Sequence, residues 1–372
     1  MFALFIAVLA LITYGCLYPW HFAAISLTHS PFWILLHSWP AHITHFLLRD
    51  IAVNLVIYIP AGLTGHLAFR RRGYRWLAFI APIAICAVLS ASIEMIQLWV
   101  PSRDTSLLDL VVNVTGAILG MILAIVLEDV LPAAHSSSSK KPADHSALAL
   151  LGCGALWMLF PLMPITGRYA LHFKIASFLH APVFDPLAIL SMAVVWFAAG
   201  ELMQASHVPA VRKVILFSIL IAPARFLIVA QRPSPADMIG AALGAIAYSQ
   251  LRKPNRWVTA ILFLVTIALR GLTPFVFARE SQRFSWIPFS GFLDVAWQQG
   301  TIMAAEKFFW YGTAIWLLRR VRVSKPASLA LVAIILLGIE IAQIRIPGHV
   351  AEITDPLLAL AAGWSVFVLS ER

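Results

Sequence analysis

Apolar runs of about 20 residues recur along the chain, separated by short polar segments. A helix of that length can cross the hydrocarbon core of a bilayer, and within lipid it satisfies its own backbone hydrogen bonds. The pattern therefore predicts an all-α, polytopic transmembrane bundle of about twelve helices. The expected spans are 2–19, 51–69, 76–99, 107–127, 147–165, 187–205, 213–231, 235–251, 257–277, 301–318, 327–345 and 355–370.

Basic residues are concentrated in alternate loops between these expected spans. Short cytoplasmic loops are enriched in Lys and Arg, so we expect these loops on the cytoplasmic side. An even number of spans then places both termini in the cytoplasm. The residues are Arg70, Arg71, Arg72, Arg75, Lys140, Lys141, Arg212, Lys213, Arg252, Lys253, Arg256, Arg319, Arg320, Arg322 and Lys325.

The composition excludes a water-soluble enzyme. Of the 372 residues, 61% are hydrophobic and 12% are charged, whereas a soluble domain carries about a quarter charged residues. The formal net charge of +10 does not indicate nucleic-acid binding, because the basic residues separate apolar runs instead of gathering on one soluble surface. The three cysteines lie in distant apolar runs, and no Cys/His spacing suits zinc, so we expect no metal and no cofactor.

Two stretches of the chain share polar residues at the same spacing. Residues 94–116 align without a gap with residues 340–362. The alignment pairs Glu94 with Glu340, Gln97 with Gln343, Pro101 with Pro347 and Asp109 with Asp355. A weaker copy at 225–244 places Arg225 opposite Gln97 and Asp237 opposite Asp109. These internal repeats predict three parallel units of about four helices each.

One Ser-rich segment, residues 128–145, separates two apolar parts of the chain and is expected to be a cytoplasmic linker. The predicted organisation is a four-helix unit at 1–127, this linker, a degenerate second unit at 146–252 and a diverged third unit at 253–372.

The shared polar residues can meet at one point in the first unit. Glu94 and Gln97 are three residues apart on one expected helix, and Asp109 and Asn113 are four apart on the next, so each pair shares a helix face. The turn between the two helices directs both faces toward a polar centre near the outer surface. Ionisable groups at membrane depth cost about 2.5–3.5 kcal/mol each, so such a cluster predicts a functional site.

Three further residues of the first unit could complete this pocket. Arg103 lies at its edge, and Asp50 and Asn54, four residues apart at the outer start of the second expected span, could close it. Secondary candidates in the other two units are Arg225, Asp237, Lys307, Glu340, Gln343 and Asp355. Of these, Lys307 could complement the charge of Glu340 and Asp355.

A purely structural role could explain the same residues. Asp109, near a helix N-terminus, could cap that helix, and Glu94, Gln97 and Arg103 could tie two helices together. The sequence has no HExxH motif, no Gly-rich phosphate loop and no GxSxG elbow, so the prediction leans away from an enzyme.

Three segments of the first unit resemble the VanZ-like membrane proteins, a family named for a teicoplanin-resistance protein. They are YGCLYPW at 14–20, RDIAVNLVIYIPAG at 49–62 and SIEMIQLWVPSRDTSLLDLVVNVTGAILG at 92–120. The C-terminal part is similar to a diverged copy, with Ala359, Ala362 and His349 in place of Asn113, Gly116 and Arg103. The resemblance implies a multi-pass protein of the bacterial cytoplasmic membrane that acts in the cell envelope, with glycopeptide tolerance as the property of the namesake.

The leading hypothesis is that the outward-facing pocket binds a lipid head group or a lipid-linked glycan. The expected partner is accordingly a membrane lipid or a lipid-linked envelope precursor, and no nucleic acid. One alternative is an intramembrane hydrolase or transferase that uses Glu94 and Asp109 as acid and base. Another is a structural membrane scaffold.

Overall fold

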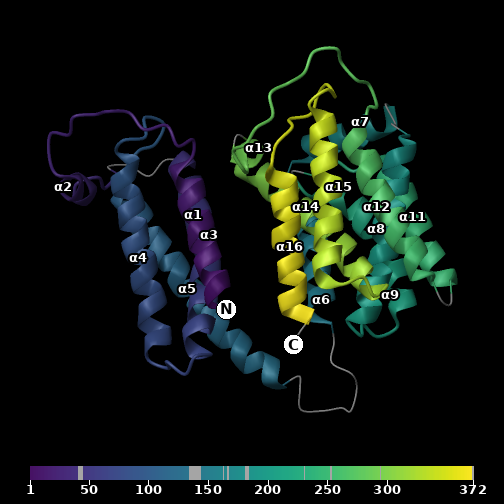
Figure 1. The fold of residues 1–372 in the computed structure, drawn as a ribbon, viewed down its shortest axis with the longest axis horizontal. Helices are drawn as coiled ribbons and strands as arrows, with labels where there is room; N and C mark the ends of the chain where they lie inside the picture. Colours follow the sequence, from purple (N-terminus) through teal and green to yellow (C-terminus); the bar gives the residue numbers. More distant parts are fainter. Residues whose placement is uncertain are drawn as a thin grey trace. The chain divides into compact units, whose positions relative to one another are not determined.

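The computed structural model describes residues 1–40, 45–133, 144–161, 163–165, 167–180, 184–229, 231–251, 254–293 and 295–370. These residues form helices and loops, with two isolated β-bridges and no strand among them. The predicted all-α fold is therefore confirmed for this part of the chain. The chain divides into two compact units, Met1–Lys140 and Lys141–Arg372, which are described separately below (Figure 1).

Within the described residues, four helices are both long enough and apolar enough to cross a membrane. They are Leu77–Gln97, Leu107–Val126, Pro186–Ala205 and Lys325–Gln343. Shorter apolar helices occur at Leu4–Leu17, His145–Leu159 and Thr354–Ser370. The helices agree with a protein that resides in a membrane, while the number of twelve spans and their orientation stay predictions.

The described residues of the N-terminal unit form four long helices and one short one. The helices are α1 (Phe2–Leu17), α2 (Pro31–Leu36), α3 (His45–Arg70), α4 (Leu77–Gln97) and α5 (Leu107–Ala133). Helix α5 continues past residue 127, so the segment expected to be a linker begins inside a helix, and its residues 134–143 lie outside the described part of the chain.

Helices α3 and α5 pack with their backbones in close contact because glycines face them. A Cβ atom on Gly62 of α3 would lie 1.8 Å from the Ala117 carbonyl oxygen of α5. A Cβ atom on Gly116 of α5 would lie 2.3 Å from the Leu55 carbonyl oxygen of α3. Small residues that allow this approach are typical of helix pairs in membranes.

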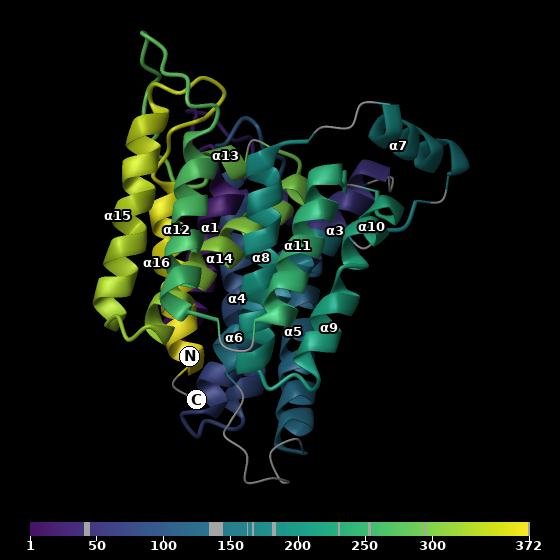
Figure 2. The same cartoon turned by 90° about the vertical axis from the view of Figure 1, so that its right-hand side faces the viewer.

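The C-terminal unit contains the remaining elements of the chain (Figure 2). Large aromatic side chains, among them Trp157, Phe263 and Phe309, are buried in its core. The elements are α6 (His145–Leu159), α7 (Arg168–His180), α8 (Pro186–Ala205), α9 (Val211–Ser218), α10 (Ile221–Ala224), η1 (Arg225–Leu227), α11 (Pro235–Gln250), α12 (Arg256–Leu272), α13 (Ser290–Leu293), α14 (Trp297–Arg320), α15 (Lys325–Gln343) and α16 (Thr354–Ser370).

The start of α6 is fixed by Asp144. Its side chain accepts the backbone N–H groups of Ser146 and Ala147 at 3.0 and 3.2 Å, and it accepts the indole N–H of Trp316 at 2.9 Å. Burial alone would raise the pKa of the Asp144 carboxyl, but hydrogen bonds from Ser146 and Trp316 outweigh burial and hold this pKa below its ordinary value. The charged form of Asp144 thus joins α6 to α14.

The single helix expected over 213–231 is wrong. The structure divides this stretch into α9, α10 and the 3₁₀ turn η1. Pro223 explains the break, because it has no N–H and its ring clashes with the carbonyl four residues earlier, at Ile219, which follows the end of α9.

One arrangement of hydrogen bonds occurs at three places in the chain, after α1, α6 and α12. Each of these helices is followed by a cis X–Pro bond, at Tyr18–Pro19, Phe160–Pro161 and Thr273–Pro274. In each place a side chain from a later loop lies within hydrogen-bond distance of the carbonyl oxygen that precedes the proline. The pairs are Arg103 Nε with Tyr18 O at 3.3 Å, Gln231 Nε2 with Phe160 O at 2.9 Å, and His349 Nε2 with Thr273 O at 2.6 Å.

A backbone hydrogen bond recurs beside these side-chain contacts. In each place an N–H shortly after the proline donates to a carbonyl near the end of the segment expected to be the third helix of its unit. The pairs are Ala23 with Trp99 at 2.8 Å, Ile165 with Leu227 at 2.8 Å, and Ala278 with Arg345 at 2.7 Å. This recurrence is what a chain of three related units would produce, although the division into three units stays a prediction.

Candidate functional site: polar residues between α4 and α5

Glu94 lies near the end of α4 and is 4% exposed. Its carboxylate oxygen Oε2 accepts the backbone N–H of Ser106 at 2.9 Å, and its backbone carbonyl accepts the hydroxyl of Thr105 at 2.8 Å. The turn that connects α4 to α5 is thus folded back onto Glu94. This contact places the start of α5, and with it Asp109, beside the glutamate.

Gln97 and Arg103 connect this turn to the end of α1. The buried amide of Gln97 donates from Nε2 to the Cys16 carbonyl at 2.9 Å. Exposed Arg103 donates from Nε to the Tyr18 carbonyl. Both side chains therefore hold the end of α1 against the α4–α5 connection.

Asp109 and Asn113 lie on one face of α5, as their spacing predicts. Asn113 donates from Nδ2 to the Ser90 hydroxyl of α4 at 2.9 Å. The oxygens Asp109 Oδ1 and Asn113 Oδ1 are both buried and have no hydrogen-bond partner among the described residues. Two buried acceptors, from residues one turn apart on α5, thus lack donors in the described part of the chain.

The two residues predicted to close the cluster come from α3. Asn54 makes a side-chain hydrogen bond to Asp109, and Asp50 lies within electrostatic range of the same carboxylate. Asp50 is exposed, whereas Asn54 is half-buried. Glu94 also lies within electrostatic range of Asp109, so α3, α4 and α5 bring their acidic groups together.

Sequence reasoning missed two serines that shape this cluster. The backbone N–H of Ser106 holds Glu94, and the Ser106 hydroxyl accepts the N–H of Asp109 at 3.4 Å. The Ser38 hydroxyl accepts the N–H of Leu107 at 2.9 Å. The spacing of Ser106 and Asp109 is that of a capping residue and an acidic residue three positions later, which is a recognisable signal at a helix start.

The charge of the cluster is not balanced by an ion pair. Among the described residues no Lys or Arg forms an ion pair with Glu94 or Asp109. Arg103 lies within electrostatic range of Glu94 but uses its Nε to bind a backbone carbonyl. Nor do any three or more His, Cys, Asp and Glu side chains in the described ranges form a group that could hold a metal ion.

Residues 2–128 match the VanZ/LLP1 family model. The resemblance predicted for the N-terminal region is therefore confirmed, and the N-terminal unit is called the VanZ-like unit below. The match ends before the C-terminal unit, so the diverged copy there stays a prediction. Neither the curated proteins nor the solved structures that were compared contain a match to the chain.

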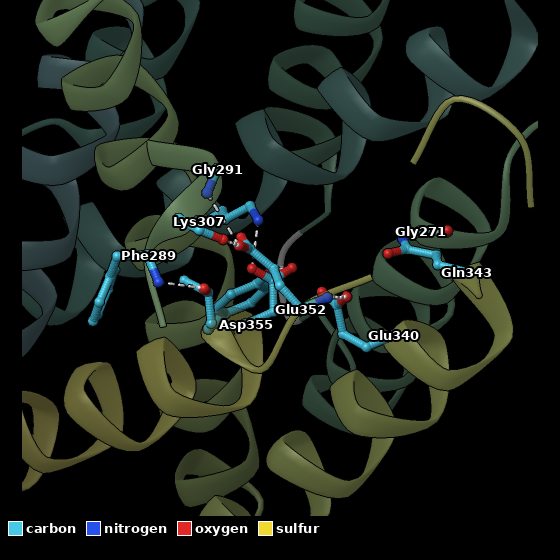
Figure 3. Close-up of polar contacts among 11 residues, drawn as sticks. Gly271, Phe289, Gly291, Lys307, Glu340, Gln343, Glu352 and Asp355 are labelled. Carbon is cyan, nitrogen blue, oxygen red and sulfur yellow. Dashed lines mark hydrogen bonds and ion pairs between the residues drawn. The ribbon is translucent and has the colours of Figure 1, made fainter. Parts of the chain in front are cut away.

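A corresponding cluster in the C-terminal unit holds its glutamate in the same way as the VanZ-like unit does (Figure 3). Glu340, near the end of α15, is 2% exposed, and its Oε2 accepts the N–H of Glu352 at 2.8 Å. The amide of Gln343 donates to the Gly271 carbonyl at 2.8 Å. These contacts match those of Glu94 with Ser106 and of Gln97 with Cys16.

The aspartate of this second cluster is neutralised within the chain. Lys307 on α14 forms an ion pair with Asp355 through Oδ1. The hydroxyl of Tyr311, one turn along α14, donates to Asp355 Oδ2 at 2.6 Å. The side chain of Glu352 is likewise held, by the Ser290 hydroxyl and the Gly291 N–H at 3.1 and 3.2 Å. Sequence reasoning missed Tyr311, which lies outside the aligned stretches, and Glu352, which stands opposite a residue of another type, Ser106.

The third candidate pair, Arg225 and Asp237, is also neutralised within the chain. Arg225 is 8% exposed and pairs with Asp237 at 3.3 Å. Its Nε donates to Gln231 Oε1 at 3.1 Å. Asp237 also forms a capping box with Ser234 at the start of α11. Of the three places, the VanZ-like unit alone leaves its aspartate without an ion pair among the described residues.

Proposed function

We propose that the VanZ-like unit binds the head group of a membrane lipid or of a lipid-linked glycan at Glu94, Asp109 and Asn113, with Asp50 and Asn54 at the edge. The observation that carries this proposal is the pair of buried oxygens, Asp109 Oδ1 and Asn113 Oδ1, that lack donors. A buried acceptor without a donor costs about 1–3 kcal/mol, and more when it is charged.

The ligand that fits this cluster carries hydrogen-bond donors. Hydroxyl groups of a sugar or a polyol can donate to Asp109 and Asn113, and an ammonium group can also balance the acidic charge. A membrane lipid supplies such groups at the end of an apolar chain. Because α4 and α5 are both long enough to cross a membrane, a ligand of this kind can reach the cluster from the bilayer.

We also propose that the chain is a multi-pass protein of a bacterial cytoplasmic membrane, built from three parallel four-helix units with both termini in the cytoplasm. The repeated hydrogen bonds after α1, α6 and α12 support the three-unit organisation. The alternating basic loops support the orientation, in which the cluster faces outward. Glycopeptide tolerance would follow if the bound ligand were a lipid-linked cell-wall precursor.

The test is a lipid-resolved mass spectrum of the purified full chain in detergent. The double variant Glu94→Gln and Asp109→Asn is compared with the wild type and with Glu340→Gln, which makes the first of these two changes at the corresponding place in the C-terminal unit. We expect a lipid or glycolipid to co-purify with the wild type and with Glu340→Gln, and to be lost from the double variant.

Two outcomes of this experiment oppose the proposal. If all three proteins carry the same lipids in the same amounts, the cluster does not bind a head group, and its role as a tie between helices is favoured. If the lipid is lost equally from Glu340→Gln, the binding does not depend on the VanZ-like unit. Unfolding temperatures of the variants, measured in parallel, separate loss of ligand from loss of fold.

A further inference from the structure

A pocket of about 360 Å³ lies at one end of the C-terminal unit, away from the clusters described above. It is formed by the last turn of α8, the first turn of α9 and the last turn of α11, three helices that pack together (Figure 2). The residues that line it include Gln204, Tyr248, Arg212 and Lys213. Asp237 lies at the opposite end of α11, so this pocket is separate from the ion pair of Arg225 and Asp237.

Tyr248 and Gln204 provide neutral polar groups in this pocket. The ring of Tyr248 is buried, with 5% of the residue exposed, and its hydroxyl donates to Gln204 Oε1 at 3.1 Å. This bond fixes the orientation of the Gln204 amide and leaves its N–H groups as potential donors. The pocket therefore has donors in addition to its cations.

The first turn of α9 adds backbone donors to the pocket. Its N-cap residue is Ala210, which makes no side-chain hydrogen bond to the helix. The N–H of Lys213 donates to the Ala210 carbonyl at 2.7 Å, so the N–H groups of Val211 and Arg212 are the donors that this turn can offer, and the helix dipole gives this end a partial positive charge. Ala210, Val211, Arg212 and Lys213 all line the pocket, so this helix end borders it directly.

The charges around the pocket are predominantly positive. Arg212 lies within electrostatic range of the Tyr248 hydroxyl. Glu201 is an acidic group within electrostatic range of Tyr248, but it is 2% exposed and also lies within electrostatic range of Arg320 and Arg256. No ion pair of Arg212 or Lys213 is recorded within the described ranges.

We propose that this pocket binds a phosphate group. Arg212 and Lys213 supply charge, Gln204 supplies amide donors, and the uncapped start of α9 supplies backbone N–H groups, which together are the groups that bind phosphate in proteins. Because α8 is long and apolar enough to cross a membrane, its end lies where phosphate head groups of lipids are found. The phosphate could come from an anionic lipid or from a soluble phosphate compound. This inference does not rest on the head-group site of the VanZ-like unit.

The test uses the full chain in detergent and two probes, dioleoyl phosphatidylglycerol and inorganic phosphate. Binding of the lipid is measured by native mass spectrometry, and binding of inorganic phosphate by its protection of the protein against thermal unfolding. The variant Arg212→Gln with Lys213→Gln is compared with Arg71→Gln and Arg72→Gln, which removes the same charge from two exposed arginines after α3.

Loss of one or two charge-assisted hydrogen bonds corresponds to at least about a tenfold weaker binding. We expect this loss for the Arg212 and Lys213 variant, and less than about a twofold change for the Arg71 and Arg72 variant. Tyr248→Phe, which releases Gln204, is expected to weaken binding by a smaller factor, about threefold.

The two probes identify the source of the phosphate. A lipid head group is supported if the Arg212 and Lys213 variant binds phosphatidylglycerol tenfold more weakly and inorganic phosphate does not compete with the lipid. Protection by inorganic phosphate that is lost in the same variant supports a soluble phosphate compound. Equal losses in the two charge variants would mean diffuse attraction to the basic loops and would overturn the proposal, as would the absence of binding by either probe.

Discussion

The VanZ-like unit and the C-terminal unit hold a buried glutamate by the same contacts but treat the neighbouring aspartate in opposite ways. Glu94 and Glu340 each accept a backbone N–H from the residue twelve positions later. Asp355 is then neutralised by Lys307, whereas Asp109 has no ion pair among the described residues. The comparison shows that the backbone contact of the glutamate can be kept while the partner of the aspartate changes. The aspartate without an ion pair among the described residues is the one in the VanZ-like unit.

The helix that faces the aspartate accounts for part of this difference. Counting nine residues back from Arg71, which directly follows α3, gives Gly62, and counting nine back from Arg320, which ends α14, gives Tyr311. Gly62 lets α3 approach the backbone of α5, whereas Tyr311 reaches Asp355 with its hydroxyl. In the C-terminal unit α14 thus supplies two side chains, Lys307 and Tyr311, that bind Asp355, whereas in the VanZ-like unit α3 supplies Asn54 to Asp109.

Removing Lys307, the cation that pairs with Asp355, should lower the free energy of unfolding the most. Lys307→Met leaves Asp355 next to Glu340 with no ion-pair partner, and breaking a buried ion pair on one side costs about 3 kcal/mol. We expect a lower free energy of unfolding by about this amount, measured by denaturant titration of the detergent-solubilised protein. The double variant Lys307→Met with Asp355→Leu should recover most of the loss. If Lys307→Met is neutral, the ion pair does not stabilise the C-terminal unit.

A methyl group between α3 and α5 should have the next largest effect. The Cβ of Gly62→Ala would lie 1.8 Å from the Ala117 carbonyl oxygen, so the two helices must move apart. Overpacking of this kind costs about 2 kcal/mol. Gly338→Ala on α15, where no atom lies within 4 Å of the added carbon, is the matched control and should be neutral or slightly stabilising. Thermal unfolding of both variants measures the difference, and equal midpoints would contradict the close packing of α3 on α5.

The hydrogen bond from the glutamine side chain to a helix-end carbonyl should contribute the same free energy of unfolding in both units. Gln97→Leu and Gln343→Leu each leave a helix-end carbonyl, of Cys16 and Gly271, without its side-chain donor. We expect each variant to lower the free energy of unfolding by about 1 kcal/mol. Because the two contacts lie in separate units, the losses of the two single variants should add in the double variant, and this sum is the check. A loss confined to one unit would mean that the two glutamines do not have equivalent roles.

The sequence predicted the framework of these clusters and Lys307 as a partner of Asp355, but not the other contacts that hold the second aspartate. Equal spacing identified Glu94, Gln97 and Asp109 together with their counterparts, because helix periodicity and short turns are local properties of a chain. Tyr311 was not predicted, since its bond to Asp355 spans 44 residues and depends on how α14 packs. The break at the end of α9 was missed as well, because apolar composition alone does not reveal the effect of Pro223 on the helix.

The smallest effect on stability is expected at the residue that we consider most important for binding. Asp109→Asn removes no ion pair recorded among the described residues, so we expect the free energy of unfolding of the ligand-free protein to change by less than about 0.5 kcal/mol. Asp355→Asn makes the same chemical change but leaves Lys307 without its acidic partner, and should cost about 2 kcal/mol. Parallel denaturant titrations of delipidated protein measure both values. If Asp109→Asn lowers the free energy of unfolding as much as Asp355→Asn does, Asp109 is needed for the fold. The proposed difference between an aspartate without an ion pair and a neutralised aspartate would then be wrong.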